Sequence, residues 1–296
     1  MDESQQDSFL AEWVLDGFER GGSKNEYSWA LSALQKVHPR LRLKTAWKVL
    51  DAWTSLSPVR QAPAAPPELL HAMIVLALIL GRPQLSLAML LAYCGLLRVR
   101  EVLCLRVGDV ILGPNTLVLC LGRTKRGMEQ KVVLTNPSVI QWFANYISRF
   151  PLKDSHDLLF DISYGSMLRW VKRLAFLLGA ESLHLTTHTF RRSGASELSR
   201  QGMSLNDILL YGRWLSERAA RDYIRKGEVA IWRARGLLSD DDWGRIVSWG
   251  QLAFHAWSVF DGALAINVKS QHMHAVTMAR LSALEASLFT LVMKNT

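Results

Sequence analysis

Cysteine is scarce in this chain of 296 residues, and long apolar runs are missing. The three cysteines, Cys94, Cys104 and Cys120, lack CxxC spacing, which excludes the usual zinc and disulfide patterns and favours buried thiols in a reducing compartment. The apolar run at residues 72–80 is much shorter than the ~20 residues of a membrane span, so it predicts a core helix. No secretory signal is visible at the N-terminus. We therefore expect an intracellular protein, without a membrane partner.

Acidic residues are outnumbered, and carboxylates do not gather as they do around metal ions. The chain has 26 Asp and Glu against 35 Lys and Arg, a net charge of +9 and a pI near 9.7. This balance favours a polyanionic partner, above all nucleic acid, although an anionic membrane or plain solubility would also account for it. The HxxxH spacing of His184 and His188 lacks a third ligand. We expect no metal and no cofactor.

Most of the chain shows apolar residues at helical spacing, interrupted once by β-type runs. Residues 116–121 and 130–135 predict a hairpin with a basic tip. The predicted fold is mainly α with a small antiparallel β-sheet, an α+β arrangement. Helical patterns occupy residues 26–56 (two helices broken at Pro39), most of 68–112, 138–150 and 164–179.

Composition divides the chain into four segments. Residues 1–56 predict a short helical N-terminal module with interleaved basic residues, and residues 57–67 a Pro-rich linker. Residues 68–228 predict the main domain. Residues 229–296 form a Trp-rich helical extension, whose apolar faces are expected to pack within the molecule or against a partner.

Six residues suited to attack on a phosphodiester follow one another through the main domain. Two arginines offer planar forks to phosphate oxygens, while a histidine and an indole N–H add hydrogen bonds. A lysine on a hairpin tip can donate a proton to the leaving oxygen, and a tyrosine can act as nucleophile. These residues are Arg98, Arg191, His188, Trp214, Lys125 and Tyr223.

Local signals place these residues on short helices. Thr187 is expected to cap a helix on which His188 and Arg191, three residues apart, share a face. A capping box at Ser204 opens a second helix that stops at Gly212. Ser216 is expected to cap the last helix, which ends at Gly227 and carries Tyr223 in its final turns.

Each of these residues also has an ordinary structural interpretation. Arg98 alone would be a helix-surface arginine, and Lys125 with Arg126 a basic turn. His188 and Arg191 would form a polar helix face. Trp214 and Tyr223 would be packing aromatics. Only the six together, in this order, favour catalysis.

Taken together, four motifs resemble those of the tyrosine recombinase (phage integrase) family, especially its Cre branch, over residues 68–228. They are the segment from Gly95 to Asp109 with Arg98 and Glu101, the hairpin Gly122-Arg-Thr-Lys125, the pair His188-Thr-Phe-Arg191, and Gly212-Arg-Trp214 followed by Tyr223. The resemblance implies that Tyr223 attacks a DNA phosphate, forming a 3′-phosphotyrosine and releasing a 5′-hydroxyl without metal or ATP. It also implies that Glu101 supports Arg98 indirectly and that Lys125 is the general acid.

The resemblance implies double-stranded DNA as the partner and a tetramer of this chain on the DNA, in the nucleus or the cytoplasm according to the organism. The expected DNA contacts are Lys36, Arg40, Arg42, Lys44, Lys48, Arg123, Arg126 and Arg192. Two alternatives remain at this point. One is a DNA-binding protein that keeps the fold without recombining, and the other is a type IB topoisomerase-like enzyme that relaxes DNA.

The chain departs from the family pattern at both ends. The helical DNA clamp that usually precedes the catalytic domain spans roughly a hundred residues, whereas here the linker begins at Ser57. The tail after Tyr223 is longer than the single helix that many relatives dock into a neighbour. We treat docking of part of this tail into a second copy as a hypothesis.

Overall fold

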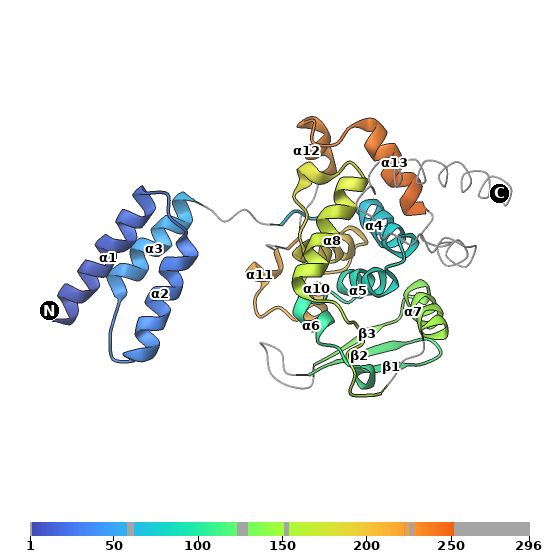
Figure 1. Cartoon of the computed structure of the whole chain (residues 1–296), viewed down its shortest axis with the longest axis horizontal. Helices are drawn as coiled ribbons and strands as arrows, with labels where there is room; N and C mark the ends of the chain where they lie inside the picture. Colours follow the sequence, from blue (N-terminus) through green and yellow to red (C-terminus); the bar gives the residue numbers. More distant parts are fainter. Residues whose placement is uncertain are drawn as a thin grey trace. The chain divides into compact units, whose positions relative to one another are not determined.

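The computed structural model describes residues 2–57, 62–122, 130–150, 154–221, 223–224 and 228–251. The chain forms two compact units, divided between Gln61 and Ala62 (Figure 1). The division falls in the proline-rich stretch, of which residues 58–61 lie outside the described residues. Ala65 already belongs to the second unit, because its backbone N–H donates to Ser193 Oγ at 2.7 Å.

The first unit is a bundle of helices α1 (Glu3–Glu19), α2 (Lys24–Val37) and α3 (Lys44–Leu56). Its buried core includes Val14, Leu31, Leu50 and Trp53. The carboxylate of Asp7 on α1 accepts hydrogen bonds from the Thr45 and Ala46 N–H groups at 2.8 and 3.0 Å. These groups lie in the first turn of α3 and have no partner within the helix, so Asp7 caps its N-terminal end. The predicted break at Pro39 between two helices is confirmed. Helix α1 was not predicted, although Asp2 and Gln5 form a capping box at its start.

Two consecutive helices form the centre of the second unit. Almost every residue of α4 (Pro67–Ile79) and α5 (Pro83–Cys94) is buried, which explains why neither shows a polar face. This confirms the core helix predicted at residues 72–80. Helices α7 (Pro137–Arg149) and α9 (Thr187–Arg200) pack on α5, whereas α8 (Tyr164–Leu177) and α13 (Asp240–Gln251) pack on α4.

A three-stranded antiparallel sheet has the order β1 (Val110–Leu112), β2 (Leu117–Leu121) and β3 (Gln130–Leu134). The alternation along β2 buries Leu117, Leu119 and Leu121 toward the core. The predicted hairpin is confirmed as β2 and β3, with Leu119 opposite Val132, whereas β1 was not foreseen. The tip of the hairpin, residues 123–129, lies outside the described residues.

Three helix boundaries bear on the site. Thr186, not Thr187 as predicted, caps α9, and its side chain accepts the His188 N–H at 3.2 Å. The predicted Ser204 cap of α10 (Leu205–Gly212) is confirmed. Helix α11 (Glu217–Arg221) is shorter than expected, so the prediction that Tyr223 lies within it is wrong, since Tyr223 follows it in a turn.

The remaining short elements are α6 (Val99–Leu103), the 3-10 turns Val107–Asp109 and Glu181–Leu183, and α12 (Glu228–Ala234). All three cysteines are free. The expectation of buried thiols is wrong for Cys104, which is exposed, while Cys94 and Cys120 are half-buried. Among the described residues, no helix is both long and apolar enough to cross a membrane.

The contact between α5 and α9 depends on Gly194. A β-carbon at this position would overlap the carbonyl oxygen of Tyr93. The two backbones can approach this closely only because glycine has no side chain. Arg191 lies one turn before Gly194 on α9, so this close approach fixes how near Arg191 comes to the end of α5.

We expect Gly194→Ala to lower the free energy of unfolding by about 1–3 kcal/mol, because the added methyl group must push α9 away from a backbone atom. Gly244→Ala is the matched control. Gly244 lies within α13 with open space around it, so alanine there should raise stability by about 0.5–1 kcal/mol. Thermal unfolding of both variants tests this, and equal effects would refute the close-packing argument.

Candidate active site

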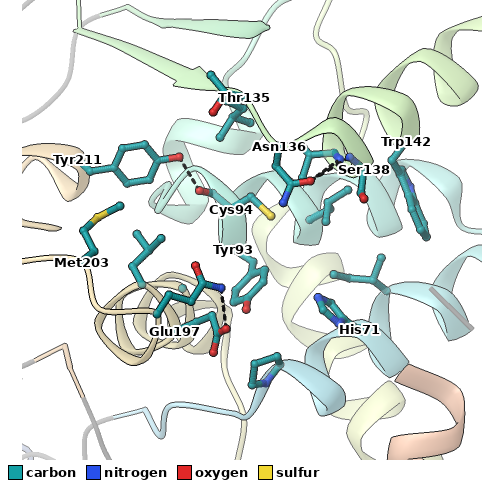
Figure 2. Close-up of a pocket in the computed structure, with 18 of the residues that line it drawn as sticks. His71, Tyr93, Cys94, Thr135, Asn136, Ser138, Trp142, Glu197, Met203 and Tyr211 are labelled. Carbon is teal, nitrogen blue, oxygen red and sulfur yellow. Dashed lines mark hydrogen bonds between the residues drawn. The ribbon is translucent and has the colours of Figure 1, made fainter. Parts of the chain in front are cut away.

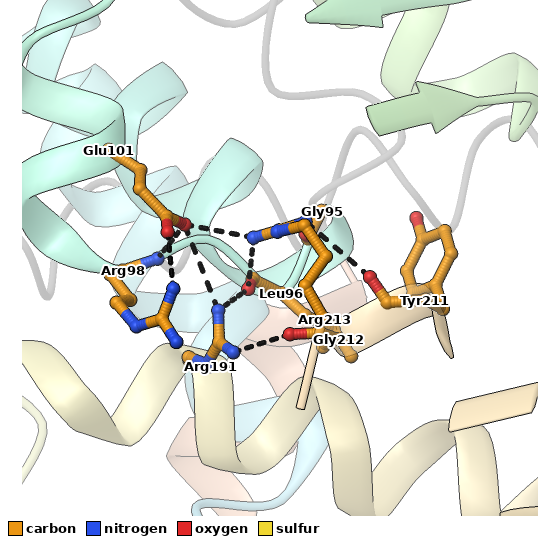
Figure 3. A network of polar contacts seen from close by, with 8 residues as sticks. All are labelled: Gly95, Leu96, Arg98, Glu101, Arg191, Tyr211, Gly212 and Arg213. Carbon is orange, nitrogen blue, oxygen red and sulfur yellow. Dashed lines mark hydrogen bonds and ion pairs between the residues drawn. The ribbon is translucent and has the colours of Figure 1, made fainter. Parts of the chain in front are cut away.

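The carboxylate of Glu101 forms the centre of a buried polar cluster (Figure 3). Its Oε1 accepts from Arg98 Nη1 at 2.6 Å, and its Oε2 accepts from the Arg98 backbone N–H at 2.8 Å. The same Oε2 accepts from Arg213 Nη2 at 2.8 Å and lies 3.8 Å from Arg191 Nη1. One carboxylate therefore faces three guanidinium groups that come from three separate parts of the second unit.

The carbonyl of Leu96 is a second point of convergence. It accepts hydrogen bonds from Arg191 Nη1 and from Arg213 Nη2, the latter at 3.1 Å. Leu96 is fully buried and has a φ of 45°, a left-handed conformation that is unfavourable for a leucine. This conformation is maintained where its carbonyl meets two arginines, just after the C-terminal end of α5.

Arg191 is the most deeply enclosed of the cations, with 1% of its side chain exposed. Its Nη2 donates to the carbonyl of Gly212 at 2.5 Å, whereas its buried Nε–H has no hydrogen-bond partner among the described residues. Burial, followed by repulsion from Arg98 and Arg213, lowers the pKa of Arg191 to about 9, which leaves it a cation at neutral pH. An unpaired buried donor on a cation is well suited to receive an anion.

Two aromatic rings cover this guanidinium. The Trp214 and Tyr223 ring centroids are 5.0 Å apart, and the Arg191 guanidinium carbon lies 4.6 Å from the Trp214 centroid and 5.7 Å from that of Tyr223. Arg192 stacks on the Tyr223 ring at 5.0 Å. The Tyr223 ring thus lies against the guanidinium groups of two arginines.

His188 lies in the first turn of α9, with its side chain exposed to solvent. The surrounding protein partly desolvates the imidazole, and the charges of Arg191, Arg192 and Arg98 oppose its protonation; together they lower the pKa of His188 below 6.5. His188 is therefore neutral near pH 7, with one ring nitrogen free to accept a proton.

Glu101 remains ionised in this setting. Burial alone would raise its pKa, but the Arg98 backbone hydrogen bond and the charges of Arg213 and Arg98 outweigh burial and lower it. Three guanidinium groups around one carboxylate leave an excess of positive charge. Such an excess in a largely dry site favours an anion with several oxygens.

The structure brings together most of the catalytic residues predicted from the sequence, namely Arg98, Glu101, His188, Arg191, Trp214 and Tyr223. Lys125, Arg123 and Arg126 lie outside the described residues. Arg192, a predicted DNA contact, is only 7% exposed and lies against Tyr223. The five remaining predicted contacts are all exposed on the first unit, at Lys36, Arg40, Arg42, Lys44 and Lys48.

Arg213 was not among the predicted site residues. The sequence pattern correctly ended a helix at Gly212. A β-carbon on Gly212 would overlap the Trp214 ring, and the next residue, Arg213, takes the left-handed conformation with a φ of 58°. The sequence signal that could have identified Arg213 was a charged residue directly after the glycine that ends a helix.

A separate pocket of about 460 Å³ is lined in part by Tyr211 (Figure 2). The Tyr211 hydroxyl donates to the Cys94 carbonyl at 2.8 Å at its edge, and His71, Trp142 and Glu197 are among its lining residues. None of the predicted catalytic residues lines it. Within the described ranges, no three metal-ligating side chains come together.

Comparison with known proteins identifies the family of this chain. The phage integrase family matches residues 79–228. The XerH site-specific recombinase, bound to a palindromic difH substrate in a post-cleavage complex, has a TM-score of 0.51 and 16% identity over 79% of this chain and 72% of its own. The Tn1549 transposon integrase in complex with circular intermediate DNA also has a TM-score of 0.51 and 16% identity, over 77% and 84%.

At these identities the solved structures establish the fold alone. No curated protein sequence matches the chain significantly. The family match covers half of the chain. The matched part includes helices α6, α9 and α10, which carry or adjoin the arginines of the cluster, and the turn that bears Tyr223. The chain therefore belongs to the phage integrase family, the tyrosine recombinases, which break and rejoin DNA.

Proposed function

We propose that this chain is a site-specific recombinase in which Tyr223 attacks a phosphate of double-stranded DNA. The Tyr223 oxygen forms a bond to phosphorus, the bond from phosphorus to the 5′-oxygen breaks, and a 3′-phosphotyrosine results. A 5′-hydroxyl from a partner strand then reverses these steps and rejoins the DNA. The observation that carries this proposal is the packing of Tyr223 against Arg191 and Arg192.

Arg98 and Arg191 are proposed to hold the non-bridging oxygens of the phosphate. Arg98 is the accessible member, with 28% of its side chain exposed, whereas Trp214 and Tyr223 cover Arg191. We infer that these two rings shift when DNA binds, so that the Nε–H of Arg191 meets the phosphate. Charge placed at the developing oxyanion is the main source of rate in such sites.

The proton path uses two groups. The neutral imidazole of His188 accepts the proton of the Tyr223 hydroxyl, or positions a water that does so. Lys125, by its resemblance to the family lysine, donates a proton to the leaving 5′-oxygen. The Trp214 indole N–H adds a hydrogen bond to the phosphate. No step in this scheme requires a metal ion or ATP.

DNA binding is proposed to involve the first unit as well. Five exposed cations gather at the end of α2, in the following loop and on the first turns of α3. Lys44 and Lys48, four residues apart, share one face of α3. Contacts of this kind go to phosphates and provide affinity without base readout. We further propose that recombination uses a tetramer of this chain on paired sites.

The nucleophile can be tested directly. We expect the wild type, in EDTA and low salt, to form an SDS-resistant adduct with a nicked random-sequence duplex library, and Tyr223→Phe to form none, because phenylalanine lacks the attacking oxygen. Tyr164→Phe, which removes an exposed hydroxyl on α8, is the matched control and should react normally. An adduct in Tyr223→Phe would disprove the assignment.

Two further outcomes distinguish the rival functions. If the wild type binds DNA in a salt-sensitive manner yet never forms an adduct, the chain behaves as a DNA-binding relative without catalysis. If it relaxes supercoiled plasmid as a monomer and exchanges no strands between two plasmids, it acts as a type IB topoisomerase-like enzyme. Sequencing the trapped DNA identifies the target.

The acid limb of the pH profile should report His188. Its pKa lies below 6.5, so the neutral form that accepts a proton is complete above that value and is lost as the pH falls through the pKa. We expect the second-order rate constant for adduct formation to fall about tenfold per pH unit once the pH is below the pKa of His188. His188→Asn should be ~10²-fold slower near pH 7.5 and should lack this limb.

The exposed ring of His156 provides the control for this experiment, since it lies outside the cluster. His156→Asn should keep both the rate and the acid limb. An unchanged acid limb in His188→Asn would assign the titration to another group.

The contribution of the first unit should appear in the salt dependence of binding. We expect the double variant Lys44→Ala, Lys48→Ala to reduce the slope of log K against log salt by roughly 2, about 0.9 for each lost phosphate contact. Arg20→Ala removes an equally exposed cation paired with Asp16 at 2.9 Å and should leave the slope unchanged. Equal slopes for all three proteins would exclude these lysines from the interface.

A further inference from the structure

Arg213 occupies a backbone position where an arginine is unfavourable. Its φ of 58° is left-handed, a conformation that glycine adopts without strain and other residues rarely adopt. Leu96, the residue whose carbonyl it contacts, is left-handed as well. The side chain of Arg213 is nevertheless 7% exposed and directed entirely inward. A residue kept in such a conformation indicates that its side chain has a use.

The contacts of Arg213 join two elements of the site. Its Nη2 donates to Leu96 O at 3.1 Å and to Glu101 Oε2 at 2.8 Å (Figure 3). Its Nη1 lies 3.5 Å from the Gly95 carbonyl. The turn between α10 and α11, which carries Trp214, is thereby bound to the end of α5 and to the start of α6, where Arg98 lies.

The charge of Arg213 also changes what Glu101 does to its neighbours. Without Arg213, the Glu101 carboxylate would have only Arg98 and Arg191 as counterions, and its attraction would oppose their contact with a phosphate. Arg213 supplies a cation of its own at 2.8 Å, closer than the 3.8 Å that separates Glu101 from Arg191. The charge of Glu101 is thus shared between Arg98, at 2.6 Å, and an arginine that need not touch DNA.

We propose that Arg213 is a positioning residue: it acts as a second close counter-cation of Glu101 beside Arg98 and holds the Trp214 turn against the start of α6, so that the charge of Glu101 opposes phosphate binding by Arg98 and Arg191 less. This inference rests on the proposed function for the identity of the phosphate. The alternative is a purely structural role, in which Arg213 caps the C-terminal end of α5 and contributes to folding.

Arg213→Gly separates the two interpretations, because glycine relieves the left-handed backbone while it removes the guanidinium. We expect single-turnover adduct formation on the nicked random-sequence duplex library to slow by about 10- to 100-fold at saturating protein, with the Kd for DNA within about threefold of wild type. Arg213→Lys, which restores a charge, should recover part of the rate. His184→Gly, which relieves a φ of 51° outside the cluster, should react as wild type does.

A double variant tests whether Arg213 acts through Glu101. Glu101→Gln removes the charge that Arg213 is proposed to balance, so adding Arg213→Gly to it should slow the reaction less than about threefold further. A full additional loss in the Glu101→Gln background would overturn the proposal. So would Arg213→Gly with a rate within twofold of wild type.

A second readout does not depend on cleavage. Orthovanadate resembles the phosphoryl transition state, so we expect it to raise the melting temperature of the wild type and of His184→Gly, and to raise that of Arg213→Gly less than half as much. If vanadate behaves in this way but Tyr223 forms no adduct, the proposed function fails while the role of Arg213 stands. An equal vanadate response in Arg213→Gly overturns that role. A wild type that shows neither adduct nor response overturns both.

Discussion

The arrangement of the site depends on one negative charge placed among three arginines, of which Arg191 and Arg213 are buried. Glu101 accepts from the Arg98 backbone and side chain and from Arg213, and it lies near Arg191. Without this carboxylate, three guanidinium groups packed together would repel one another in a region of low dielectric. With it, the cluster keeps a net positive charge and a fixed geometry. These are the two properties that binding a phosphate requires.

The cluster in turn depends on backbone conformations that are unfavourable by themselves. Leu96 and Arg213 both have a left-handed backbone conformation. A hydrogen bond from Arg213 Nη2 to the Leu96 carbonyl joins the two residues. Gly194 lets α9 approach α5, and Gly212 leaves room for the Trp214 ring. The strain and the missing side chains occur where Arg191 must reach the carbonyls of Leu96 and Gly212. Stability is thus given up locally so that donors converge.

Sequence reasoning succeeded where a motif fixes both the residue type and the spacing. The helix that carries His188 and Arg191, the β2 and β3 hairpin and the Ser204 cap follow from period and capping chemistry. It failed where tertiary contacts decide. Helix α1 was missed because its polar and apolar residues are not clearly separated onto two faces, although it carries a capping box. The last predicted helix was too long, because α11 ends before Tyr223. The role of Arg213 was invisible because its partners, Leu96 and Glu101, are more than a hundred residues away in the chain.

The separation of roles along the chain has a consequence for the reaction. The arginines lie on or beside helices that pack into the core, whereas Tyr223 lies in a turn after the short α11. A phosphate-binding cluster gains from rigidity, since its donors must be in place before charge develops. The proposed nucleophile, which bonds to phosphorus and is later displaced from it as the leaving group, gains from a segment that can move. Trp214 follows Arg213 in the chain and its ring contacts Tyr223, so it lies where these two requirements meet.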